Sequence, residues 1–139
     1  MFGNHLIKAW SVTQGVIALS SGEAEFYGIV KGSSVGMGIQ SVMGDLSIGV
    51  KLQVLTDSSA AKGIASRRGL GKVRHIEVNQ LWVQEKVAIG AIEQNKVPGE
   101  VHVADSLTKH VGREMIDRHM ENTNQSIVEG RHKLMPSVD

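Results

Sequence analysis

The stretch that decides the fold class is residues 16–27, Val-Ile-Ala-Leu-Ser-Ser-Gly-Glu-Ala-Glu-Phe-Tyr. Its first four residues favour β structure. Ser20 and Glu23 then have the spacing of a capping box, in which both side chains bind backbone N–H groups at the start of a helix. Apolar residues recur at helical spacing as far as Met43. We therefore predict a helix over about residues 21–44, preceded by β structure.

The residues before this helix predict a hairpin. From Leu6 to Leu19 most residues are apolar or β-favouring, and Gln14-Gly15 is a turn signal between two runs. We expect two antiparallel strands here.

The predicted helix carries an unusual number of glycines, and each glycine inside a helix costs about 1 kcal/mol relative to alanine. Gly28, Gly32 and Gly36 are spaced four apart and share one face. One interpretation is that another backbone comes close to this face; the alternative is a weak, frayed helix.

Strands and helices alternate further along the chain. We predict, in order, a strand over 51–56, a short helix over 58–66, an amphipathic helix over 74–88, a strand over 91–97 and a helix over 101–111. This order favours a mixed α/β sheet with helices against it. We expect one domain over residues 1–111, followed by a polar C-terminal extension over 112–139, partly helical or disordered.

The composition excludes several classes of protein. The chain has 139 residues, of which 41% are hydrophobic, enough for one folded core. No apolar run approaches the length of a membrane span, so no membrane partner is expected. The chain has no cysteine, which excludes disulfides and thiolate zinc sites. With no visible secretory signal, we expect an intracellular protein, cytoplasmic or nuclear.

The charge balance excludes nucleic-acid binding by bulk positive charge, because 15 basic residues stand against 14 acidic ones. Positive charge is concentrated instead in one stretch. This basic stretch contains Lys62, Arg67, Arg68, Lys72, Arg74 and His75. It predicts either a local contact with phosphates or an ordinary solvated surface.

Three acids occupy positions at which sheet-based folds often build sites. Glu25 lies in the first turns of the long helix, Asp57 ends the strand over 51–56, and Asp105 lies near the start of the last predicted helix. Grouped carboxylates without cysteine suit Mg²⁺, and paired Mg²⁺ ions support phosphodiester cleavage. The alternative is that each acid only caps or stabilises a helix start.

Four sequence blocks resemble the ribonuclease H domain of copia-type retrotransposon polyproteins. Residues 16–27 resemble its signature Val-Ala-Leu-Ser-Ser-Thr-Glu-Ala-Glu-Tyr, and residues 55–61 resemble its strand-end aspartate followed by a helix. Residues 74–87 resemble its Lys-His-Ile-Asp-Val helix, and residues 97–109 resemble its closing block with Leu-Ala-Asp-Ile-Leu-Thr-Lys. The resemblance implies a ribonuclease H-like mixed sheet flanked by helices.

The resemblance also implies a function. In that family carboxylates hold two Mg²⁺ or Mn²⁺ ions and support endonucleolytic hydrolysis of RNA in RNA/DNA hybrids. The catalytic and metal ligands then fall on Glu25, Asp57 and Asp105. Glu23 is the alternative to Glu25, but Glu23 already has a capping role. The implied partners are the hybrid and the reverse transcriptase portion of the same polyprotein.

Other residues acquire roles from the same resemblance. His102 corresponds to an accessory histidine of cellular ribonucleases H, thought to help product release; the alternative is an exposed histidine without a role. The residues implied near the hybrid are Ser58, Arg67, Arg68, Lys72, Arg74 and His75. His75 has an equally weighted alternative as a structural residue at a helix start.

One departure from the family pattern lowers the expected activity. The family's first catalytic aspartate lies on its first strand, but residues 1–22 contain no acid. We expect that the first strand is missing and that the chain alone has weak or no activity. The alternative function is an inactive remnant that binds nucleic acid or a polyprotein partner.

Overall fold

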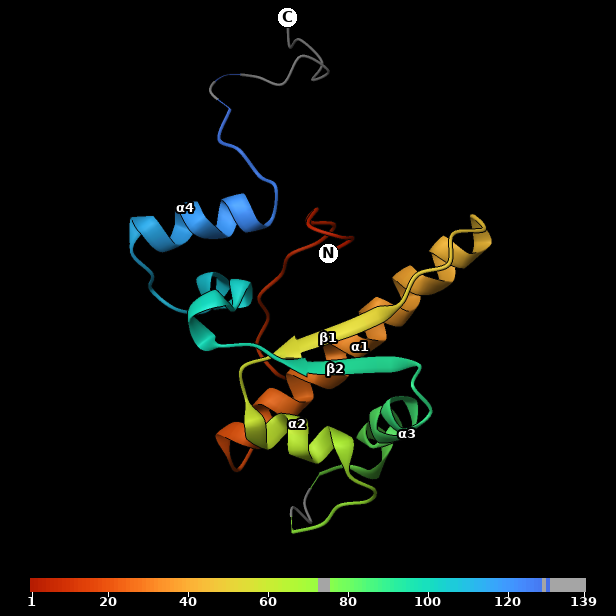
Figure 1. Ribbon diagram of the computed structural model, residues 1–139. Helices are drawn as coiled ribbons and strands as arrows, with labels where there is room; N and C mark the ends of the chain where they lie inside the picture. The colour runs from red at the N-terminus through yellow and green to blue at the C-terminus, as the bar shows by residue number, and fades with distance from the viewer. Residues whose placement is uncertain (73–75, 129, 131–139) are drawn as a thin grey trace, which may run out of the picture. The chain divides into compact units, whose positions relative to one another are not determined.

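The computed structural model describes residues 1–72, 76–128 and 130 and shows a mixed α/β protein (Figure 1). Its helices and strands follow in the order α1 (Ser21–Asp45), β1 (Leu52–Thr56), α2 (Ser59–Ser66), η1 (Val78–Gln80), α3 (Trp82–Ala88), β2 (Ile92–Lys96), η2 (Gly99–Val101), η3 (Val103–Leu107) and α4 (Arg113–Asn122). The η elements are short 3₁₀ helices. The chain forms two compact units, one of Val12–His102 and one of Met1–Ser11 with Val103–Asp139.

Helix α1 begins at the predicted capping box. The Ser20 hydroxyl accepts a hydrogen bond from the Glu23 backbone N–H at 3.2 Å, and the Glu23 carboxylate accepts one from the Leu19 N–H at 2.9 Å. These bonds satisfy N–H groups that have no partner inside a helix. The predicted helix over 21–44 is therefore confirmed.

Strands β1 and β2 form a parallel pair, the one sheet among the described residues, with Leu52 opposite Ile92 and Thr56 opposite Lys96. Both arrows end on the same side in Figure 1. The crossover between them contains α2 and α3, which pack with α1 around the core. The fully buried core members are Phe26, Ile29, Val30, Ala61, Ile64, Ala65, Ile76 and Val83. The predicted strands over 51–56 and 91–97 and the helix over 58–66 are confirmed to within a residue or so.

The predicted hairpin over Leu6–Leu19 is wrong, because the structure has no strand there. Ile17 is 88% exposed and Leu19 is 70% exposed, so the apolar side chains gain nothing from burial. An isolated two-stranded hairpin is only marginally stable without a packed face. Local β propensity alone therefore does not build strands in this segment.

The predicted helix over 74–88 is too long. Helix α3 begins at Trp82, and Glu77 has an extended backbone (φ −60°, ψ 131°) before η1. The short 3₁₀ segment η1 then separates Glu77 from the start of α3. Residues 73–75 lie outside the described residues.

The predicted helix over 101–111 is also wrong. Two 3₁₀ segments stand there, and His102 between them has an extended backbone (φ −77°, ψ 96°) that interrupts any continuous helix. Val101 and Leu107 are each 45% exposed, so a longer helix would have little apolar surface to bury. Short helices need such packing to be stable.

The glycine face of α1 comes close to a neighbour at one of the three predicted positions. A Cβ atom at Gly36 would lie 2.5 Å from Leu52 Cδ1, whereas one at Gly28 or Gly32 would meet no described atom within 4 Å. The neighbour is a side chain and not a backbone. The interpretation of a close backbone along the whole face is therefore wrong.

The second unit is organised around α4. The Leu6 N–H donates to the Thr123 carbonyl at 3.4 Å, and the His5 ring lies 2.9 Å from the Asn124 amide nitrogen. These contacts join the N-terminal segment to the end of α4. None of the helices in the described ranges is both long enough and apolar enough to cross a membrane.

Candidate metal centre

Asp57 stands directly after β1, in the turn that leads into α2. The Ser58 N–H donates to the Thr56 hydroxyl at 3.1 Å, and the Ser58 hydroxyl accepts from the Ala61 N–H at 3.1 Å. The first bond closes the turn around Asp57, and the second caps α2 one residue after Asp57. Asp57 is half-buried, and a Cβ on Gly99 would lie 3.7 Å from its Oδ2. The carboxylate therefore lies beside the chain that leaves β2.

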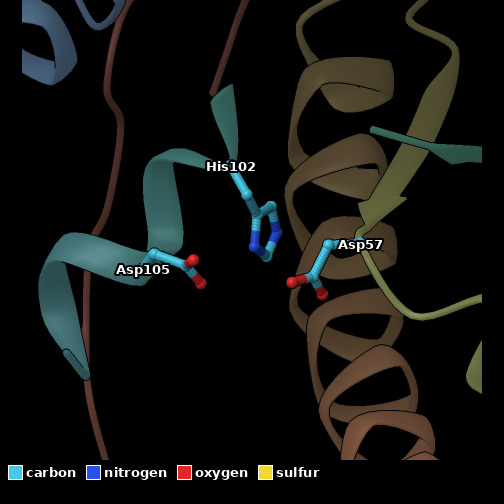
Figure 2. A group of neighbouring side chains, drawn as sticks. All are labelled: Asp57, His102 and Asp105. Carbon is cyan, nitrogen blue, oxygen red and sulfur yellow. The ribbon is translucent and has the colours of Figure 1, made fainter. Parts of the chain in front are cut away.

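His102 reaches the same edge of the sheet from β2. It follows η2, its N–H donates to the Gly99 carbonyl at 3.1 Å, and its side chain is half-buried. A ring nitrogen of His102 and a carboxylate oxygen of Asp57 lie within 4.8 Å of one another. Figure 2 shows the two side chains pointing toward one another. These two donor atoms could hold a metal ion.

Asp105 belongs to the other unit and lies on η3. Its side chain is 17% exposed, and its Oδ2 is 2.8 Å from the ammonium of Lys109, one helical turn later. The backbone N–H of Lys109 also donates to the Asp105 carbonyl at 2.8 Å. Asp105 follows His102 by three residues in the sequence, and Figure 2 shows the Asp105 side chain on η3.

The structure separates the roles of the two glutamates on α1. Glu23 is buried, and its carboxylate accepts hydrogen bonds from Leu19 and, at 3.2 Å, from the Tyr27 hydroxyl. Its capping role is confirmed. Glu25 is exposed and, within the described ranges, belongs to no group of donor atoms that could close on one cation. Glu25 is thus not brought together with Asp57.

Burial raises the pKa of the Tyr27 hydroxyl, and its hydrogen bond to the Glu23 carboxylate raises it further. The negative charges of Glu23 and Glu77 act in the same direction, and the backbone hydrogen bond from Glu77 opposes them. The hydroxyl therefore stays protonated and serves as a donor to Glu23.

The expected substrate-binding residues fall into three groups. Arg67, Arg68 and Lys72 lie on the loop after α2, with Arg67 half-buried and the other two exposed. Arg74 and His75 lie outside the described residues. Ser58 is engaged as the cap of α2.

His102 has a closer neighbour in the structure than its sequence position indicated. The histidine was expected to be accessory, yet it is the residue that the structure places beside Asp57. One sequence signal was available, since His102 closely follows the Pro98-Gly99 turn after a strand. A residue there lies at the carboxyl edge of a parallel sheet, where sites are commonly built.

The fold and the site define a class and no more: a mixed α/β protein with an oxygen and a nitrogen donor paired at the carboxyl edge of two parallel strands. No protein-family model matches the chain, and no curated protein or solved structure matches it either.

Proposed function

We propose that the chain is a ribonuclease H-like domain of the copia-type retrotransposon kind, which binds a divalent cation and hydrolyses RNA in RNA/DNA hybrids. The observation that carries the proposal is the pairing of Asp57 with His102 at the carboxyl ends of β1 and β2. An acid and an imidazole that are distant in the sequence share this edge, and both stand in the blocks that resemble the family.

Asp105 completes the proposed ligand set. It lies three residues after His102, so the chain keeps their Cα atoms within about 11 Å of one another. Asp105 also stands at the position of the last aspartate in the block that resembles the family. Glu25 is not part of this set, because it is exposed on α1.

The donor types indicate which cation fits. Carboxylates suit Mg²⁺ and Mn²⁺, while imidazole suits transition metals better than Mg²⁺. A set of two carboxylates and one imidazole therefore fits Mn²⁺ at least as well as Mg²⁺. When bound, such a cation activates a water molecule and stabilises the leaving oxygen in phosphodiester cleavage.

The chain's own residues have separate tasks in this proposal. Asp57, His102 and Asp105 hold the cation, and the turn capped by Ser58 orients Asp57. Arg68 and Lys72 contact phosphates of the hybrid. Contacts of this kind follow the shape and charge of the hybrid and give no base specificity.

The first experiment measures Mn²⁺ binding by electron paramagnetic resonance titration of the full chain and of single variants. We expect Asp57→Asn, His102→Gln and Asp105→Asn each to weaken binding at least tenfold, because each removes one donor. Glu25→Gln and the exposed-acid control Asp117→Asn should bind as the unchanged chain does. Equal binding by all variants would refute the site.

The second experiment measures cleavage of an end-labelled RNA/DNA hybrid with Mn²⁺ or Mg²⁺. We expect slow endonucleolytic cleavage of the RNA strand that Asp57→Asn abolishes. An RNA/RNA duplex of the same sequence should remain intact. Cleavage that persists in Asp57→Asn would point to a contaminating nuclease and contradict the proposal.

A second candidate function is binding of nucleic acid without catalysis. The exposed position of Glu25 favours it, because a carboxylate expected at the centre is absent from the group around Asp57. This candidate predicts that the chain binds the hybrid in EDTA and does not cleave it with either cation. Cleavage lost in Asp57→Asn would exclude it.

A further inference from the structure

A buried glutamine organises the basic loop that follows α2. Gln84 on α3 is 6% exposed, and its amide nitrogen donates to the carbonyls of Ile64 at 2.8 Å and Gly69 at 3.0 Å. Its amide oxygen accepts from the Gly69 N–H at 2.8 Å. The side chain thus joins the last turn of α2 to the middle of the loop.

The partners leave one orientation for the Gln84 amide. With oxygen and nitrogen exchanged, an NH₂ group would face the Gly69 N–H, and an oxygen would face two carbonyls. The Ile64 carbonyl lies in the last turn of α2, where carbonyls have no partner inside the helix. Gln84 therefore satisfies a helix end and fixes a loop with one side chain.

The loop itself, residues 67–72, has a defined conformation. Gly69 (φ +75°) and Gly71 (φ +58°) adopt left-handed backbone angles that side chains rarely allow. The Arg67 guanidinium donates to the Leu70 carbonyl, and a Cβ on Gly71 would lie 2.8 Å from Arg67 Cζ. Arg67 is therefore folded back on the loop, which leaves Arg68 and Lys72 as its exposed cations.

The surroundings of the two exposed cations favour an anionic partner. Among the described residues, the salt bridges of Lys109 with Asp105 and of Arg113 with Asp117 do not involve Arg68 or Lys72. Arg68 lines a hollow of about 330 Å³ together with Glu85 and with the apolar side chains of Leu81, Ala88 and Ile89. The loop thus holds positive charge next to a concave surface.

We propose that Gln84 is a positioning residue for nucleic-acid binding, which holds loop 67–72 so that Arg68 and Lys72 meet adjacent phosphates of one strand. Arg67 assists from within the loop. This inference rests on the hybrid as the substrate of the proposed function, but it needs no cation. The energetic reason is that a loop fixed in advance loses less conformational entropy when it binds.

The test is a double-mutant cycle on binding of a fluorescent RNA/DNA hybrid by the full chain in EDTA, at several salt concentrations. We expect Arg68→Ala to weaken binding about fivefold to tenfold and to lower the salt slope by about one contact. Gln84→Met keeps the volume but removes all three hydrogen bonds, and it should weaken binding several-fold. The double variant should bind nearly as Arg68→Ala does, since Gln84 acts through the loop.

Two further variants separate positioning from stability. Val83→Ala, at a neighbouring fully buried site on α3, destabilises the core without removing a hydrogen bond of the loop, so it should leave hybrid affinity unchanged. Arg67→Lys keeps the positive charge but removes the guanidinium that donates to the Leu70 carbonyl, so it should weaken hybrid binding. This variant tests the loop even if Gln84→Met does not fold.

Faster exchange of the Gly69 amide proton in Gln84→Met is the expected structural signature. Purely additive effects of Gln84→Met and Arg68→Ala would overturn the inference, as would failure of the unchanged chain to bind the hybrid. Because the assay contains EDTA, neither result depends on the cation site. Loss of cleavage in Asp57→Asn with normal hybrid binding would leave the loop inference intact.

Discussion

Two glycines of α1 allow a matched test of how closely this helix packs on β1. Gly28 and Gly36 share one helix face, but a Cβ atom at Gly28 meets no described atom within 4 Å. At Gly36 it would lie 2.5 Å from Leu52 Cδ1 and 3.2 Å from Cδ2. Alanine at the two positions therefore changes the helix equally and the packing differently.

The expected magnitudes follow from these distances. Replacing an interior helical glycine by alanine stabilises the fold by about 0.5–1 kcal/mol, and Gly28→Ala should show this whole gain. At Gly36 the end of the Leu52 side chain must move, and a displaced rotamer costs about 0.5–1.5 kcal/mol. We therefore expect Gly36→Ala to be neutral or destabilising, about 1 kcal/mol less stable than Gly28→Ala.

The assay is urea unfolding followed by far-ultraviolet circular dichroism, with the midpoint and the slope fitted for each variant. An unchanged slope shows that the midpoint reports stability alone. A stabilisation by Gly36→Ala equal to that by Gly28→Ala would refute the reasoning, because it would mean that Leu52 does not lie against α1. Gly32→Ala, also without a described neighbour, should repeat the Gly28 result.

Two further predictions concern Ser58 and Tyr27. Ser58→Ala removes the cap of α2 and should cost about 1 kcal/mol of unfolding free energy, measured by the same urea titration, whereas Ser59→Ala next to it should cost much less. The pKa of Tyr27 is raised in the folded chain. The contribution of its hydroxyl to the stability of the fold is therefore fully present below the unfolded-state pKa of about 10, and it is lost as the pH rises through the folded-state pKa. Tyr27→Phe should therefore reduce the loss of stability as pH rises above about 10, and an unchanged pH profile would contradict the assignment.

The elements that the sequence predicted well are those fixed by local chemistry. Ser20 and Glu23 are three residues apart, and their reciprocal bonds need nothing from the rest of the chain. Strand β1 likewise coincides with the predicted run that ends in Val54 and Leu55, and alternate residues of both strands are buried or half-buried. Local signals were sufficient for these elements.

The elements that were predicted wrongly depend on distant partners. Glu77 is extended between η1 and Ile76, which is buried in the core with residues of α1 and α2 that are far away in the sequence. The segment over Leu6–Leu19 has strong β propensity but lacks a face to bury. Neither cause is visible in a window of neighbouring residues.

The candidate site was predictable in part. Asp57 could be selected because a carboxylate at a strand end is a privileged position. Its pairing with His102 depends on the parallel register of β1 with β2, which the sequence does not state. Gln84 gave no signal, because a buried glutamine that holds a loop looks in sequence like any helix-surface glutamine.

The register of the parallel pair also has a consequence for the order of folding. Gln53 and Glu93 face each other across the sheet although they are 40 residues apart in the chain. Bringing these two residues together closes a long loop, and the chain loses conformational entropy before the strand pairing offsets that loss. Contacts of this kind therefore form slowly. Asp57 and His102 become neighbours only when the closure is complete. A nascent or partly unfolded chain can therefore contain the capped start of α1 before Asp57 and His102 have come together.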